Sequence, residues 1–207
     1  MDLSTVPAFV LGNGPGLTAL LKFLPLLRKR LSIGVNRILR SGFAPTVIAW
    51  VDTTIWQDES AALDAAEQAG TLLVSSAMST PSSVFLQTVG GNAAWTTEQT
   101  ARVLLCRGNS AVMVARWALD GLGCPRVHML GCAATGRGDF YGENPWHLRG
   151  AAGDSVAEMH RELDLLLAKY SDRVDLVQTP DELLATIAGS DEIDEQATIR
   201  EIRKLTT

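Results

Sequence analysis

Two glycines and an amide side chain that could hold a phosphate group lie together near the start of the chain, at Gly12, Asn13 and Gly14. The apolar residues 8–11 before them predict a buried strand, and Pro15 after them is typical of the first turn of a helix. Glycine has no Cβ, so backbone amides can approach an anion closely, and the helix N-terminus adds partial positive charge. The run predicts a phosphate- or nucleotide-binding turn, although a strand-to-helix turn in an α/β protein can carry two glycines without binding a ligand.

Two further polar residues come directly after predicted strands. Asn36 follows residues 31–35, and Asp52 follows residues 46–51. In an open parallel sheet, the carboxyl ends of the strands form the edge at which ligands bind. We therefore expect Asn36 and Asp52 to belong to the same site as Asn13, with Asp52 as a candidate catalytic base.

A second turn of glycine and small polar residues, Gly108-Asn109-Ser110, opens a predicted helix over residues 110–122. The side chains of Asn109 and Ser110 could contact the same ligand as the first turn. Capping the helix is the commoner use of such residues at this position. The sequence leaves both uses open.

The segment 134–152 has no hydrophobic period and follows the predicted strand 127–132. Loops at this edge of a sheet often present catalytic and binding side chains. The alternative interpretation is a mobile surface loop that aromatic side chains hold against the protein. Its candidate functional residues are the general bases His147 and Asp139 and the substrate contacts Tyr141 and Arg149.

His147 is the histidine that we favour as a general base, because it is predicted to lie in a loop beside the site. His128 lies inside a predicted strand and is expected in the core. His160 lies on a predicted helix among charged neighbours and is expected in solvent.

The elements that must position these residues alternate between strands and helices. The other predicted strands cover residues 71–75, 84–89, 103–106 and 174–177, of which 84–89 lies within a long loop over 76–100. The other predicted helices cover residues 17–27, 58–69, 154–170 and 180–188, with Pro25 bending or ending the first, and Asp58 and Asp154 capping the second and third.

This alternation of strands and helices predicts a single Rossmann-like α/β domain over residues 1–189, with a doubly wound, mostly parallel sheet and helices on both faces. Residues 190–207 are predicted to form a charged C-terminal helix or tail, docked on this domain or on a partner subunit.

Composition narrows the class of protein. The 207 residues carry a formal net charge of −5 and are 46% hydrophobic, as expected for one globular domain. The acidic balance gives no broad attraction to nucleic acid or anionic lipid, so general nucleic-acid binding is not expected. No apolar run approaches the roughly 18 residues that span a bilayer, and no secretion signal is evident, so we expect a cytoplasmic protein that does not bind membranes. The thiols of Cys106, Cys124 and Cys132 are expected to be reduced core groups.

Four short motifs, taken in order, resemble those of a known Rossmann-like group. They are Val10-Leu11-Gly12-Asn13-Gly14-Pro15-Gly16-Leu17, Gly34-Val35-Asn36, Gly108-Asn109-Ser110-Ala111 and Arg126-Val127-His128-Met129-Leu130-Gly131. One branch of that group contains bacterial CMP-sialic-acid-dependent sialyltransferases. The other contains archaeal 6-hydroxymethylpterin diphosphokinase-like proteins and their flagellin-glycosylation relatives. The likeness runs from about residue 8 to residue 180.

The resemblance implies which residues contact a donor nucleotide: Gly12, Asn13, Gly14, Asn36, Gly108, Asn109 and Ser110. The chain also departs from the group's pattern. Gly16 stands where a serine is usual, and Ala133 stands where relatives often carry an aspartate that could hold a metal. The base histidine of the sialyltransferase branch would fall near Ala151, close to His147.

These observations favour a glycosyltransferase that moves a sugar from a nucleotide-sugar donor, CMP-linked if the sialyltransferase branch is the guide, to a hydroxyl acceptor. The alternatives are a pterin-type diphosphokinase that uses ATP and Mg²⁺, and a nucleotide-binding module without catalysis. No metal ligands are assigned, because the chain has no Asp-x-Asp pair and the need for a metal stays open. The acceptor and the oligomeric state, including a homo-oligomer, also stay open.

Overall fold

The computed structural model describes residues 2–77, 81–90, 97–106, 109–132, 138–143 and 152–207. Its centre is a seven-stranded sheet in the order β11-β8-β1-β2-β3-β4-β5, in which every neighbouring pair is parallel. Its strands are β1 (Ala8–Leu11), β2 (Leu31–Val35), β3 (Val47–Trp50), β4 (Leu72–Ser75), β5 (Val84–Phe85), β8 (Val127–Leu130) and β11 (Val174–Val177). The predicted doubly wound, parallel α/β architecture is confirmed.

Two small sheets accompany the main one. Strands β6 (Gln87–Gly90) and β7 (Val103–Cys106) pair in parallel, and β9 (Gly138–Asp139) and β10 (Gly142–Glu143) form an antiparallel hairpin. The single strand expected over residues 84–89 is therefore two short strands that belong to different sheets. Leu86 lies between them and donates its amide to Ser75 of β4, while the next residue, Gln87, donates to Arg102. The chain therefore passes from the main sheet to the β6–β7 sheet between Leu86 and Gln87.

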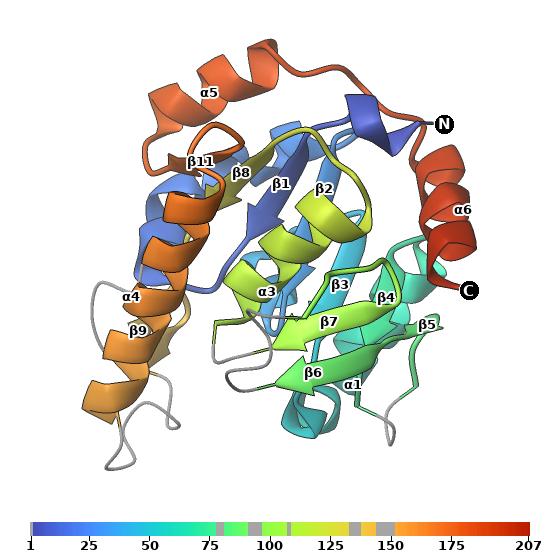
Figure 1. The fold of residues 1–207 in the computed structure, drawn as a ribbon, viewed down its shortest axis with the longest axis horizontal. Coiled ribbons are helices and arrows are strands. Elements are labelled where there is room, and N and C mark those ends of the chain that lie inside the picture. The colour runs from blue at the N-terminus through green and yellow to red at the C-terminus, as the bar shows by residue number, and fades with distance from the viewer. Residues whose placement is uncertain (1, 78–80, 91–96, 107–108, 133–137, 144–151) are drawn as a thin grey trace.

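Helices cover both faces of the sheet, as Figure 1 shows with α3 in front and α1 behind. The helices are η1 (Leu3–Thr5), η2 (Pro15–Leu27), η3 (Ile38–Ser41), α1 (Thr53–Gln68), α3 (Ser110–Arg116), η4 (Trp117–Gly121), α4 (Ala152–Lys169), α5 (Pro180–Ala188) and α6 (Glu195–Thr206). Because successive strand residues point to opposite faces, Val10 and Met129 join one core with α3 and α4, and Phe9 and Leu130 join the other with η2 and α1.

Two helix starts differ from the prediction. Helix α1 begins at Thr53, and its N-cap is Asp52, whose Oδ1 accepts the Thr54 amide at 2.9 Å. Asp58 instead lies inside the helix and pairs with Arg37. Helix α4 begins at Ala152, so Asp154 lies within its first turn. The apolar period fixes a helix interior more firmly than it fixes its first residue.

Helix η2 passes through Pro25 and ends at Leu27 as a 3₁₀ helix. Pro25 therefore does not end the helix, which continues for two residues beyond it. Long 3₁₀ helices are uncommon. Leu17, Leu20, Leu24 and Leu27 are all fully buried against the sheet.

The C-terminal helix α6 packs on its own domain. Ile199 and Ile202 lie in the core shared by the sheet and α3, with Ile202 fully buried. The segment leading into α6 is tied to the end of η2, because the Ile193 amide donates to the Lys29 carbonyl at 2.8 Å. The polarity expected for this helix is present, with Glu195 in its first turn and Arg203 and Lys204 in its last.

In the described part of the chain, no helix combines the length and apolar character needed to cross a membrane.

Candidate functional site

The sheet order reverses direction at β1. From β1 the chain passes to β2, β3 and β4 on one side and later returns to β8 and β11 on the other. At such a switch point, the connections leaving neighbouring strands diverge to opposite faces and leave a crevice at the carboxyl ends of the strands. The turn Gly12-Asn13-Gly14 leaves β1 at this crevice.

Backbone bonds lock the first turn onto the end of β8. The amides of Gly12 and Gly14 donate to the carbonyls of Leu130 and Gly131, at 2.8 and 2.7 Å. A Cβ on Gly12 would lie 2.6 Å from the Gly131 oxygen and 3.0 Å from the Cys132 Sγ atom, so glycine is required by close packing. Because these two amides are already bonded, they are not available to an anion at this turn.

Asn13 connects the turn to β2 and to the β9–β10 hairpin. Its Nδ2 atom donates to the Val35 carbonyl at 3.2 Å, and its own carbonyl accepts the Phe140 amide at 2.8 Å. Its Oδ1 atom is buried and has no hydrogen-bond donor within the described chain. A buried polar atom with unmet capacity is uncommon in folded proteins, and bound water or a ligand is one explanation for it.

Asn36 connects the turn before α3, which contains Ser110, to the turn after β1. It adopts a left-handed backbone conformation, with φ of 49°, at the end of β2. Its Nδ2 atom donates to the Ser110 Oγ atom at 3.2 Å, and Ser110 opens helix α3. Asn13, Asn36 and Ser110, predicted from three separate stretches of sequence, therefore lie side by side at one edge of the sheet.

Asn109 has a structural role in the described chain. Its Oδ1 atom accepts the amides of Ala111 and Val112, at 3.1 and 3.3 Å, and its Nδ2 atom donates to the Met159 carbonyl at 3.4 Å. Of the two uses that the sequence left open, capping is the one observed. Gly108, the other candidate in this turn, lies outside the described residues.

The β9–β10 hairpin carries two predicted site residues to the first turn. Tyr141 donates its hydroxyl to the Asp139 Oδ2 atom at 2.7 Å, and the Arg40 guanidinium lies 4.8 Å from the centre of the Tyr141 ring. Burial and the contact with Asp139 raise the pKa of Tyr141, so this phenol stays protonated at neutral pH. Its neighbour Phe140 makes the amide contact with Asn13 described above.

The remaining predicted site residues are placed as follows. Asp52 is exposed, and its carboxylate caps α1. His147 and Arg149 lie outside the described residues. No group of three or more metal-ligating side chains occurs in the parts of the chain that the structure describes.

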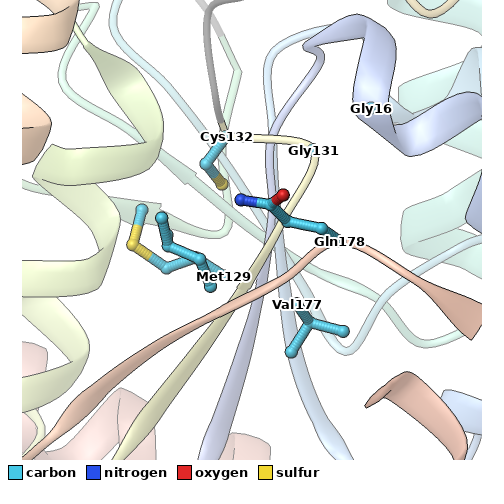
Figure 2. A pocket seen from close by; sticks show the side chains of 7 residues that line it. Gly16, Met129, Gly131, Cys132, Val177 and Gln178 are labelled. Carbon is cyan, nitrogen blue, oxygen red and sulfur yellow. The ribbon is translucent and has the colours of Figure 1, made fainter. Parts of the chain in front are cut away.

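A cavity of about 150 Å³ lies beside the first turn, over the carboxyl ends of β8 and β11 (Figure 2). Its lining residues are Gly16, Met129, Gly131, Cys132, Leu176, Val177 and Gln178. Sequence reasoning did not select Gln178 for the site. The available signal was its position directly after a predicted strand, the same signal that selected Asn36 and Asp52.

The buried side chains also confirm two predictions about the core. His128 is 8% exposed, and its ring lies tilted against that of Phe9, with the centroids 5.1 Å apart. Cys124 and Cys132 are buried and form no disulfide, while the Cys106 side chain lies outside the described part of the chain. Burial raises the pKa of each thiol to about 12, so neither is a ready nucleophile at neutral pH.

His128 makes stability depend on pH. Burial lowers its pKa below the ordinary 6.5, although Asp175, whose Oδ2 atom lies 3.1 Å from Nδ1 but outside hydrogen-bonding geometry, acts in the opposite direction. Below pH 6.5 the unfolded chain takes up this proton more readily than the folded one, so stability is retained above that pH and falls as the pH drops below it. We expect His128→Gln to flatten the dependence of the free energy of unfolding on pH between 7 and 5 in urea titrations. An unchanged slope would show that His128 does not cause it.

The fold defines the class of the protein as a Rossmann-like α/β protein, and Asn13, Asn36 and Ser110 lie together at the carboxyl edge of its sheet. Comparison with known proteins gives no match to a family model, a curated protein or a solved structure.

Proposed function

We propose that the chain is a glycosyltransferase that binds a nucleotide-sugar donor at the crevice between β1 and β8. The observation that carries this proposal is the convergence of Asn13, Asn36 and Ser110 beside the glycine turn, through the contacts from Asn13 to Val35 and from Asn36 to Ser110. The resemblance in sequence, which rests on these same turns, points to the same class of reaction.

Different residues would bind the phosphate, bind the donor hydroxyl groups and accept the proton. The amides of Asn13 and Gly16 at the start of η2 would hold a phosphate oxygen, aided by the helix dipole. The Asn13 Oδ1 atom, the Asn36 amide and the Ser110 hydroxyl would take hydroxyl groups of the donor. In the transfer step an acceptor oxygen bonds to the sugar carbon, the bond from that carbon to the phosphate oxygen breaks, and the acceptor proton passes to a base. His147 and Asp139 are the candidates for that base.

The buried, unpaired thiols of Cys124 and Cys132 suit a reducing compartment, which supports a protein that works in the cytoplasm.

A ligand panel tests the proposal. Thermal unfolding would be followed with CMP-, UDP- and GDP-sugars and separately with ATP, each with and without Mg²⁺. A ligand at a hundred times its Kd stabilises by about 2.7 kcal/mol, or roughly 5–10 °C for a domain of this size. We expect a shift with a nucleotide sugar and release of its nucleotide when an acceptor is supplied. A shift with ATP and Mg²⁺ alone would favour a diphosphokinase, and binding without turnover would favour a module without catalysis.

The base can be tested separately. We expect Asp139→Asn or His147→Ala, whichever residue is the base, to lower turnover about 100-fold or more while donor affinity stays within a few fold. Asp64→Asn makes the same change of residue type at an exposed position of α1, away from the hairpin, and is the matched control. Full turnover in both base variants would show that another group takes the proton.

A further inference from the structure

The cavity beside the first turn lies on the opposite side of that turn from Asn36. Gly16 and Gly131 form its border with the turn, while Leu176, Val177 and Gln178 belong to β11 and the residue after it. Neighbouring strands lie about 4.8 Å apart, so the two steps from β1 to β11 give the crevice an extent of roughly 10 Å on this side. A molecule held by the turn could therefore extend into the cavity.

The lining of the cavity suits an uncharged, flat, largely apolar group. None of the described residues that line it is charged, and the side chains of Met129, Cys132 and Leu176 lie on the same face of the sheet. The thioether of Met129 is a favourable contact for an aromatic ring. A bare phosphate or a hydroxyl-rich sugar would lose hydration here without gaining partners.

One side chain supplies directional hydrogen bonding. The Gln178 carboxamide points toward Cys132 across the cavity (Figure 2). The backbone of Gln178 is held in place, because its amide and that of Thr179 donate to the Glu182 Oε2 atom at 2.7 and 3.0 Å, within the capping box of α5. A carboxamide offers one acceptor and two donors, which matches the adjacent donor and acceptor on the edge of a nucleobase.

We propose that this cavity binds the nucleobase of the donor and that Gln178 reads the edge of that base. This inference rests on the proposed function and adds the orientation of the bound donor. The base lies over β8 and β11, the phosphate groups lie at the turn after β1, and the transferred sugar lies toward Asn36 and Ser110. Gln178 is then a specificity-determining residue.

The experiment compares the wild-type protein, Gln178→Leu and the control Gln57→Leu. Gln57 is an exposed residue of α1, away from the cavity lining. Affinities for CMP, CDP, UDP, ADP, GDP and inorganic pyrophosphate would be measured by titration calorimetry. We expect the wild type to prefer one base, and Gln178→Leu to weaken binding of that nucleotide about tenfold, as the loss of one or two hydrogen bonds predicts. Pyrophosphate affinity should not change, and Gln57→Leu should match the wild type throughout.

A second readout locates the base directly. An aromatic ring in the cavity should shift the Met129 methyl resonance when the preferred nucleotide binds, whereas pyrophosphate should leave it in place. Nucleotide binding with unaltered affinities in Gln178→Leu and no shift at Met129 would overturn the inference and leave the proposed function intact. Failure of every nucleotide and of pyrophosphate to bind the wild type would overturn both.

Discussion

Replacing Gly12 with alanine is expected to lower the free energy of unfolding by about 1–3 kcal/mol and to remove nucleotide binding. The added methyl group would lie 2.6 Å from the Gly131 carbonyl oxygen, which is backbone and cannot rotate away. Relief would require the end of β1 to separate from the end of β8, and the bonds from Gly12 and Gly14 to Leu130 and Gly131 would stretch. The measurement is urea-induced unfolding, followed by titration with the nucleotide that stabilises the wild type most.

Gly16→Ala is the matched control for this substitution. Gly16 lies four residues later, and a Cβ built on it meets nothing within 4 Å. We expect its stability to stay within about 0.5 kcal/mol of the wild type. If the two alanine variants were equally stable, close packing at Gly12 would not be what locks the turn.

Replacing Asn13 with alanine is expected to weaken nucleotide binding about tenfold to 100-fold, because hydrogen bonds to charged or buried partners are worth about 1.5–3 kcal/mol. Within the described chain, the side chain donates one hydrogen bond, to the Val35 carbonyl, so the loss of stability should be near 1 kcal/mol. Calorimetric titration and urea unfolding of the same samples separate the two effects. Unchanged affinity would remove Asn13 from the site.

Asn36→Gly extends this test to the neighbouring strand. Glycine accepts the left-handed backbone of Asn36 without strain, so the variant removes the amide contact to Ser110 and little else. We expect this variant to weaken binding of the nucleotide sugar by a similar factor. Thr18→Ala, at an exposed position on η2, is the control and should bind as the wild type does.

The strands were predictable because each is a short apolar run bounded by turn residues, and parallel strands are buried on both faces. Val47–Trp50 and Val174–Val177 lie within one residue of their predicted bounds. The first residue of α1 could not be predicted, because Asp52 and Asp58 are both good N-caps by residue type. In the structure Asp52 is the N-cap, and Asp58 pairs with Arg37 from another part of the chain.

In the site, too, local sequence predicted some residues, whereas contacts that depend on the order of the strands could not be predicted. Asn13 and Asn36 were found because a polar residue directly after a buried strand lies at the ligand-binding edge of the sheet. The engagement of the Gly12 and Gly14 amides could not be foreseen, since it requires knowing that β8 is the neighbour of β1. The cavity at Gln178 likewise depends on the order of β8 and β11 in space.

The most direct test of donor binding at this edge is the amide spectrum of ¹⁵N-labelled protein, titrated with the nucleotide sugar that stabilises it most. The account predicts that the largest shifts fall on the backbone amides of Asn13 and Gly16 and on the side-chain amide of Asn36. Shifts confined to residues remote from the carboxyl ends of β1 and β2, such as those of α6, would contradict it.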